Sequence, residues 1–334
     1  MLELIKNLCS IDGVSGNEDA VREYIIKLID GHCEYSVDNL GNIIAFKKGK
    51  KRPAKKIMLD AHMDEVGLIA TYITDDGLIK FDTIGYIKSE SLLSQRVRFG
   101  NVLGVIGNKP IHLTSADERK KLPKATDLYI DIGCDKKEDT EKLLRVGDTA
   151  VFSTPFCEKD GRITARALDD RIGCAVLIKL ILSEPEYDFY ATFTVSEEIG
   201  TVGAMCATYT VEPDCAICLE ATTASDILGV SGGERVSIVG EGPAVSFMDK
   251  GTLYDRELFD MAMESGLKCQ KKTAVAGGNN SRSIQRSRGG VKTMAISVPC
   301  RYIHSSSCHA ALCDVEDTLK LCEYMICKLG EMND

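Results

Sequence analysis

The segment KIMLDAHMDEVG, residues 56–67, joins an apolar run to three ionisable side chains. Its first half has the composition of a buried strand. His62, Asp64 and Glu65 follow directly, which is more polarity than a strand end usually carries. The segment is therefore either a polar turn or the first part of a metal site. Residues elsewhere in the chain distinguish these two interpretations.

The chain on both sides of residues 56–67 predicts an α/β domain. Before it, an amphipathic helix at 1–13 precedes a helix at 15–29, which Ser15 and Glu18 open at capping-box spacing. Helices and strands also alternate in the second half of the chain, which favours a mixed, mainly parallel sheet sandwiched by helices. The predicted strands are 35–39, 42–46, 55–62, 188–196, 214–220 and 292–300, and the later helices are 170–182, 201–210, 252–265 and 315–332.

The chain between residues 67 and 160 has a different pattern of predicted elements. It consists of short β-rich segments separated by Gly or Asp turns, and only residues 136–148 look helical. This pattern predicts a β-barrel or sandwich inserted into the α/β domain. We therefore expect residues 1–66 and 161–334 to form the main domain, with residues 67–160 as the insert.

Composition excludes several classes of protein. The 334 residues carry a net charge of −9, which argues against nucleic acid as a partner because phosphate binding needs a basic face. No apolar run approaches the roughly 18–20 residues that span a bilayer, and the N-terminus lacks the pattern of a signal peptide. The 14 cysteines are scattered through apolar segments, and even the pair Cys215 and Cys218 lies in a strand-like run. Reduced thiols and a cytoplasmic location are therefore expected.

Imidazoles and carboxylates recur at or just after the ends of the predicted strands. Because ligands bind beyond the carboxyl ends of strands in open α/β sheets, these side chains are candidates for one site. Each signal alone is weak, since an acidic pair before a helix also serves as an N-cap and first-turn charge. Together they have the composition of a site for two divalent ions, Zn²⁺, Co²⁺ or Mn²⁺. The candidates are His62, Asp64, Asp169, Asp170, Glu197, Glu198, Glu220 and His304.

Spacing suggests roles for some of these side chains. His62 and Asp64 are two residues apart and face the same side of an extended chain, so Asp64 can accept the second N–H of the imidazole. Glu197 and Glu198 are adjacent and diverge, so one can bind metal while the other acts as general base. The other histidines lack an acidic strand-end setting and are expected to be structural or exposed; they are His32, His112 and His309.

These motifs, in this order, resemble the tetrahedral (TET-type) metallo-aminopeptidases, a family of glutamyl and deblocking aminopeptidases in which some members carry the name endoglucanase. The resemblance covers nearly the whole chain. It rests on GVSGNED at 13–19, LDAHMDEVG at 59–67, ALDDRIG at 167–173, SEEIGTVGA at 196–204 and RYIHS at 301–305.

The resemblance implies a dinuclear metal site with an assigned role for each residue. It also implies an α/β sandwich with an inserted, barrel-like dimerisation domain, and a large cytosolic homo-oligomer that degrades peptides from the N-terminus. Its building block would be a dimer and its final form a tetrahedral dodecamer. The implied roles are metal ligation by His62 and Glu220 on one ion and by His304 and Glu198 on the other, bridging by Asp169, general base catalysis by Glu197, and orientation of His62 by Asp64.

Two positions depart from the family pattern. Glu220 stands where the family usually has aspartate, and its stem is one methylene longer. The family's Gly-Gly-Thr-Asp-Ala-Gly loop appears here as GGNNSRSIQ, residues 277–285, in which Asn280 replaces an acid and Arg282 adds a positive charge. The effect of Glu220 and of the loop Asn279–Arg282, the preferred N-terminal residue, the physiological metal and the final oligomeric state are all left open by the sequence.

The sequence is compatible with three functions. A metallo-aminopeptidase explains both histidines and the carboxylates. A glycoside hydrolase needs only a carboxyl pair, leaves the histidines unexplained, and would have few stacking platforms in a chain with no Trp and 6% aromatic residues. A non-catalytic oligomer with a drifted site is motivated by Glu220 and the altered loop, but the other site residues are intact.

Overall fold

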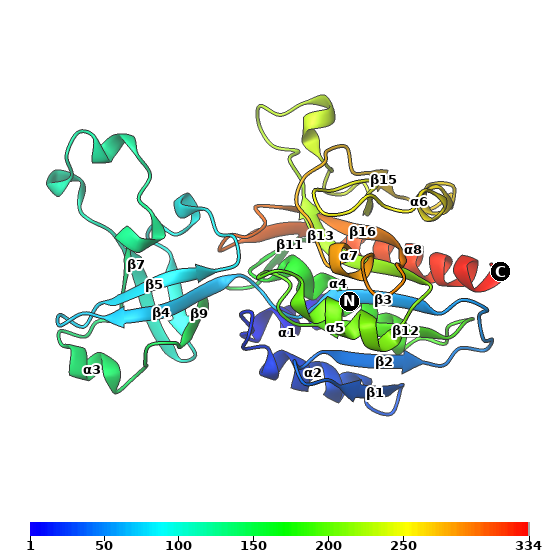
Figure 1. Cartoon of the computed structure of the whole chain (residues 1–334). Coiled ribbons are helices and arrows are strands. Elements are labelled where there is room, and N and C mark those ends of the chain that lie inside the picture. Colours follow the sequence, from blue (N-terminus) through cyan, green and yellow to red (C-terminus); the bar gives the residue numbers. More distant parts are fainter. Residues whose placement is uncertain (333–334) are drawn as a thin grey trace.

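The computed structural model describes residues 1–332, which form a large α/β body and a smaller β body beside it (Figure 1). Within these residues the larger sheet has eleven strands, in the order β1-β2-β12-β3-β13-β16-β17-β11-β10, with β14 paired to β16 and β15 paired to β14. The strand bounds are β1 Glu34–Val37, β2 Ile43–Lys47, β3 Ile57–His62, β10 Cys157–Lys159, β11 Arg162–Ala165, β12 Phe189–Thr194, β13 Cys215–Thr223, β14 Ala244–Val245, β15 Gln270–Lys271, β16 Lys292–Arg301 and β17 Cys308–Ala311.

The centre of this sheet is parallel. Strands β12, β3, β13 and β16 run side by side in the same direction, so their carboxyl ends meet at one edge. The strands outside this centre pair in antiparallel fashion, as for β2 on β12 and β17 on β16, except that β15 runs parallel to β14. The predicted mixed sheet is confirmed, and its parallel strands form the centre.

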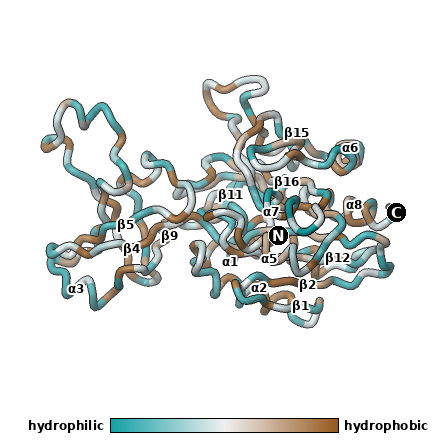
Figure 2. Tube along the Cα trace, in the orientation of Figure 1, coloured by the Kyte–Doolittle hydropathy of each residue, from teal (hydrophilic) through white to brown (hydrophobic). Residues whose placement is uncertain are grey.

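Helices cover both faces of the sheet. The buried core on one face combines side chains of α1 (Leu2–Ser10), α2 (Asp19–Ile29), α4 (Leu168–Ile181), α6 (Arg256–Met263) and α8 (Leu312–Glu331) with the inner strands. Helix α4 is buried on nearly every side, which fits its almost uniformly apolar sequence. On the other face α5 (Val202–Val211) and α7 (Ser281–Ile284) pack on β2, β3 and β13. Apolar stretches, brown in Figure 2, gather along the inner strands and their helices, while the outlying loops of the smaller body are mostly teal.

The smaller body is a closed barrel in the order β4-β5-β8-β7-β6-β9, with its own apolar core. Strands β4 and β9 pair with each other, so the chain enters and leaves the barrel through neighbouring strands. The barrel bounds are β4 Gly67–Ile73, β5 Ile79–Ile84, β6 Arg96–Phe99, β7 Val102–Gly107, β8 Tyr129–Asp131 and β9 Thr149–Phe152, with α3 at Lys137–Glu141 and short 3-10 helices at Ser89–Ser91, Ile111–Leu113, Glu118–Lys120 and Ala125–Asp127.

The predicted capping box at Ser15 and Glu18 is wrong. Helix α2 begins only at Asp19 and no side chain caps it. The Ser15 hydroxyl instead donates a hydrogen bond to Asp64 Oδ2 over 2.6 Å, and Glu18 Oε1 accepts the backbone N–H of Ser196 over 3.0 Å. A hydrogen bond to an ionised carboxylate is stronger than one between neutral groups, so the Ser15 hydroxyl bonds to Asp64 rather than capping the helix.

The other predicted elements are present with shifted ends, whereas β11, β17 and α7 (Ser281–Ile284) were not predicted. The helix predicted at 252–265 is shortened to α6 because Asp255 caps it, accepting the N–H of Leu258. Strands β14 and β15, two residues each, were not predicted, since so short a run carries no periodic signal. Among the helices of residues 1–332, none is both long and apolar enough to cross a membrane.

Candidate metal centre

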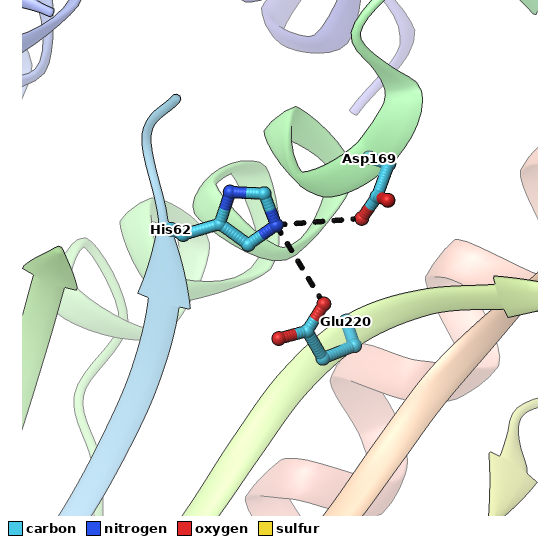
Figure 3. Close-up of side chains that lie close together, drawn as sticks. All are labelled: His62, Asp169 and Glu220. Carbon is cyan, nitrogen blue, oxygen red and sulfur yellow. Dashed lines mark ion pairs between the residues drawn. The ribbon is translucent and has the colours of Figure 1, made fainter. Parts of the chain in front are cut away.

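The side chains predicted to bind metal converge at the carboxyl edge of the parallel strands. One group, shown in Figure 3, consists of His62 from the end of β3, Asp169 from the start of α4 and Glu220 from β13. His62 Nε2 lies 3.4 Å from Asp169 Oδ1 and 3.7 Å from Glu220 Oε2. These three elements are far apart in sequence, and the sheet order brings them together.

A second group shares one of these residues. It consists of Asp169, Glu198 from the turn after β12, and His304 from the loop between β16 and β17. His304 Nε2 lies 3.2 Å from Asp169 Oδ2 and 3.5 Å from Glu198 Oε2. The two oxygens of Asp169 therefore face different groups, and each group contains one imidazole.

The donors of both groups fit divalent ions. Two ligands bound at about 2.1 Å to one tetrahedral ion lie about 3.4 Å apart. The four separations of 3.2–3.7 Å match that value. In addition, Asp169 Oδ1 and Glu198 Oε1 are buried and have no hydrogen-bond partner in the described residues. Buried carboxylate oxygens without donors are expected where a cation binds.

The electrostatics of the centre also favour cations. Burial raises the pKa of Glu198 and of Glu220 well above the ordinary range, and it raises the pKa of Glu197 to about 7. Burial also acts to raise the pKa of Asp169, but its hydrogen bond with His304 and the nearby His62 imidazole outweigh burial and hold that pKa below the usual value. Several carboxyl groups buried this close together are tolerated only if they are protonated or if a positive charge compensates them.

Asp64 lies under both groups and is fully buried. The Nδ1 atom of His62 lies 3.0 Å from the backbone oxygen of Asp64 and 3.3 Å from its Oδ1, so that nitrogen faces only acceptors and Nε2 is left for the site. Asp64 also accepts the backbone N–H groups of Glu197 and Glu198 over 3.0 and 3.1 Å. One carboxylate thus holds the imidazole of one group and the turn that presents both glutamates.

Several residues at the centre have left-handed backbone conformations. The φ angles are 55° at Ala167, 57° at Ser196 and 58° at His304. Such values are costly for residues other than glycine and cluster at functional sites. Gly85, just after β5, also has a positive φ of 76°, and a Cβ there would lie 3.2 Å from the Cβ of Glu198. At Gly85 the barrel body contacts the metal centre.

Glu65, which the sequence left without a role, anchors a buried ion network. It pairs with Arg166, lies 3.4 Å from Arg171 and accepts the N–H of Gly13. Arg166 also pairs with Asp12 over 2.8 Å. The signal that could have revealed this network is the pair of arginines flanking the motif ALDD. Its function is structural: it joins the N-terminal segment to the start of α4.

The altered loop lies beneath the centre rather than in it. Asn280 is fully buried, and its Nδ2 donates to Asp60 Oδ2 and to Thr194 Oγ1, both over 2.8 Å. Burial raises the pKa of Asp60 to about 6. An acid at position 280 would face this buried carboxyl with like charge, whereas the amide donates to it. Arg282 is exposed on the surface of the same loop.

The remaining histidines lie apart from both groups. His32 and His112 are exposed, and His309 Nδ1 contacts Thr164 Oγ1 over 3.0 Å. Within residues 1–332 all of the cysteines are free of disulfides, Cys215 and Cys218 included. The two residues of the CxxC motif are buried in β13.

Comparisons with known proteins agree with this geometry. A family model described as M42 glutamyl aminopeptidase matches residues 41–321. A putative aminopeptidase of Acetivibrio thermocellus is 37% identical over 98% of each chain, and a lysyl aminopeptidase of Pyrococcus furiosus is 32% identical over 99% of this chain and 98% of its own.

Solved structures are similar over almost the whole chain. An aminopeptidase of Desulfurococcus kamchatkensis has a TM-score of 0.91 and 35% identity, covering 97% of this chain and 93% of its own. A TET1 peptidase of Pyrococcus horikoshii, described as able to form a tetrahedron or a large octahedral shell, has a TM-score of 0.83 and 33% identity, over 97% and 98%. A protein of Thermotoga maritima named endoglucanase has a TM-score of 0.81 and 33% identity, over 98% of each chain.

Proposed function

Since this chain belongs to the M42 glutamyl aminopeptidase family and is a metallo-aminopeptidase, we propose that it removes N-terminal residues from peptides at a dinuclear centre. The observation that carries the dinuclear part is Asp169, whose two oxygens face two groups that each contain one histidine. In this proposal His62 and Glu220 hold one ion, and His304 and Glu198 hold the other.

The donor set suits Zn²⁺ or Co²⁺, with Mn²⁺ as an alternative, because these ions accept mixed imidazole and carboxylate ligands. Bound ions would supply Lewis acidity, polarising the scissile carbonyl and lowering the pKa of a water toward about 7. The methylene by which Glu220 exceeds aspartate is accommodated within β13, where its carboxylate still comes within 3.7 Å of His62.

Glu197 is the general base in this proposal. It takes the proton of the attacking water and passes it to the leaving amine. Its raised pKa, about 7 through burial, suits a group that must both accept and return a proton near neutral pH. Asp64 keeps this glutamate in place by accepting its backbone N–H, and fixes the His62 tautomer.

The substrate's free amine would lie beside Glu220, and this would account for cleavage at the first peptide bond only. In this proposal the amine lies near the ion that His62 and Glu220 would hold, and Glu220 itself is 5% exposed.

The test uses amino-acid anilides and short peptides, with protein first chelated and then reloaded with Zn²⁺, Co²⁺ or Mn²⁺. N-terminal cleavage should return with the metal, and failure of every metal to restore it would refute the proposal. Glu197→Gln should lower kcat by about 10²–10⁴ and leave metal content unchanged. Glu198→Gln should instead lose bound metal, and the exposed Glu316→Gln is the matched control. The reverse pattern would mean that the two glutamates have exchanged roles.

We also propose that the chain forms a homo-oligomer, with a dimer as building block and a dodecamer as the largest form. The barrel body offers exposed apolar side chains on its outer segment, with Ile111, Leu113 and Leu122 exposed by 71%, 60% and 57%. Light scattering after gel filtration would measure the mass, and a monomer at micromolar concentration would contradict this part. A cytoplasmic location stays a prediction from the sequence.

A glycoside hydrolase is the second candidate, since one similar structure carries the name endoglucanase. It would use a pair of carboxyls and would need neither imidazole. Hydrolysis of cellulose oligomers that survives chelation would favour it. A drifted, non-catalytic site predicts neither activity, although the donors of both groups are present and converge.

A further inference from the structure

Side chains from three distant segments accept the backbone N–H groups of four successive residues in the turn after β12. These four residues are Val195, Ser196, Glu197 and Glu198. Asn42 Oδ1 accepts the first N–H over 2.9 Å, and Glu18 Oε1 accepts the second over 3.0 Å. Asp64 accepts the last two over 3.0 and 3.1 Å. The backbone that presents both glutamates of the centre is therefore held at every residue.

The three accepting side chains are buried and reach the turn from different sides of the chain. Glu18 lies directly before α2, Asn42 directly before β2, and Asp64 two residues after β3. A buried N–H group without an acceptor is costly, and a hydrogen bond to a carboxylate is stronger than one between neutral groups. Each of these side chains therefore restrains the backbone group that it binds, and the two carboxylates restrain it most.

The restraint by Glu18 acts on the residue of the turn that needs it most. Ser196 has a φ of 57°, a left-handed conformation that is unfavourable for a residue other than glycine. Such a conformation persists only where the surroundings over-determine it. Glu18 binds the N–H of this residue, and Glu197 follows it directly, so a change of the backbone at Ser196 would turn the Glu197 side chain away from its present direction.

The contribution of Glu18 can be separated from those of the other two side chains. Asp64 also lies 3.3 Å from His62 Nδ1, so its loss would disturb a candidate metal ligand together with the turn. Asn42 also donates to the backbone oxygen of Gly203 over 3.1 Å, so its loss would disturb α5 as well. Within residues 1–332 Glu18 belongs to neither group of candidate metal ligands. Its removal should therefore affect the turn while the metal donors stay in place.

We propose that Glu18 is a positioning residue for the reaction, whose carboxylate fixes the turn so that Glu197 faces the attacking water. The inference rests on the proposed function, in which Glu197 is the general base. Glu18 touches neither the substrate nor the reacting atoms in this proposal, and it acts through the backbone of Ser196. The motif GVSGNED, residues 13–19, thereby contributes to catalysis from outside both groups of candidate metal ligands.

The test measures kcat, KM and bound metal with Leu anilide on the metal-loaded enzyme, below the unfolding temperature of every variant. Glu18→Met removes the acceptor and should lower kcat by about 10- to 100-fold, with KM within about threefold and the metal content of wild type. Glu18→Gln keeps an oxygen acceptor at the same position and should recover most of kcat. Glu18→Asp keeps the charge but withdraws the oxygen by one methylene, so it should also lose kcat, and it replaces Glu18→Met if that variant does not fold.

Two comparisons separate positioning from a general loss of stability. Asp314→Leu is the matched control, because Asp314 is also a buried carboxylate that accepts backbone N–H groups, those of Gly240 and Gly242. It should lower the melting temperature and leave kcat within about threefold of wild type. In addition, Glu18→Met combined with Glu197→Gln should be no less active than Glu197→Gln alone, because Glu18 acts through Glu197.

Several results would overturn the inference and leave the aminopeptidase intact. They are an unchanged kcat in Glu18→Asp, a loss of bound metal that accounts for the lost activity, no recovery in Glu18→Gln, an equal loss of kcat in Asp314→Leu, and independent losses in the double variant. A wild-type kcat in Glu197→Gln would instead overturn the assignment of the general base, and the inference with it. Failure to cleave any anilide with any metal would overturn the proposed function itself.

Discussion

Replacing Glu65 by Gln should destabilise the protein by about 3 kcal/mol. Glu65 is 3% exposed, and the Arg166 side chain that it pairs with is 4% exposed. Breaking a buried pair by removing one partner typically costs about 3–5 kcal/mol, because the other charge stays buried. We expect the lower end of this range, since Arg166 keeps its contact with the half-exposed Asp12 over 2.8 Å.

Arg171 should contribute little to that cost. Its guanidinium also donates to the backbone oxygens of Met63, Leu8 and Ile11, at 2.7, 2.6 and 3.1 Å, and these bonds survive the loss of Glu65. The effect of the substitution is thus concentrated in Arg166. Replacing both partners, in Glu65→Met with Arg166→Met, should cost less than the sum of the single changes by about 2 kcal/mol.

The assay is urea unfolding followed by far-UV circular dichroism, because the chain has no Trp to report by fluorescence. Each variant is measured at one protein concentration and in fully metal-loaded form, with the exposed Glu316→Gln as the control. A loss below 1 kcal/mol for Glu65→Gln, or strictly additive effects in the double variant, would refute the view that the ion pair stabilises the fold.

Three further predictions address the centre and its surroundings. Ser15→Ala should lower the free energy of unfolding by about 1.5–3 kcal/mol, measured by thermal unfolding, because Asp64 loses a hydrogen bond to its carboxylate. The same variant should retain metal less well in chelator titrations, and Ser15→Thr should restore most of the stability and of the metal retention. Burial acts to raise the pKa of Asp226, but its hydrogen bonds to Arg301 outweigh burial and hold that pKa below the usual value. The ionised carboxylate therefore stabilises the fold above about pH 4, and this stabilisation is lost as the pH falls through the lowered pKa. Asp226→Asn should therefore be less stable than wild type at pH 7 and equal to it in strong acid. Chelation should lower the melting temperature, with each ion at 1,000 times its Kd restoring about 4 kcal/mol, and an unchanged melting temperature would argue against ions in the fold.

The elements of the fold could be predicted where an apolar run is long, and the site where residue types recur at strand ends. Helix α4 and strand β13 carry such signals over nine or more residues. Contacts between distant segments could not be predicted, because they depend on register that only the packed sheet fixes. The bond from Asn280 to Asp60 joins residues 220 positions apart, and Ser15 reaches Asp64 where a local helix cap was predicted.

Because β4 and β9 are neighbouring strands, the barrel is joined to the α/β body at one place, as an exchangeable module would be. The chain leaves and rejoins the α/β body through neighbouring strands, and every predicted metal ligand lies outside Gly67–Phe152. A barrel taken from a relative could therefore be spliced between these two strands without reordering the catalytic sheet. Such a graft would have to keep a glycine at position 85, since any side chain there would press on Glu198 and carry a change in the barrel directly to the metal centre.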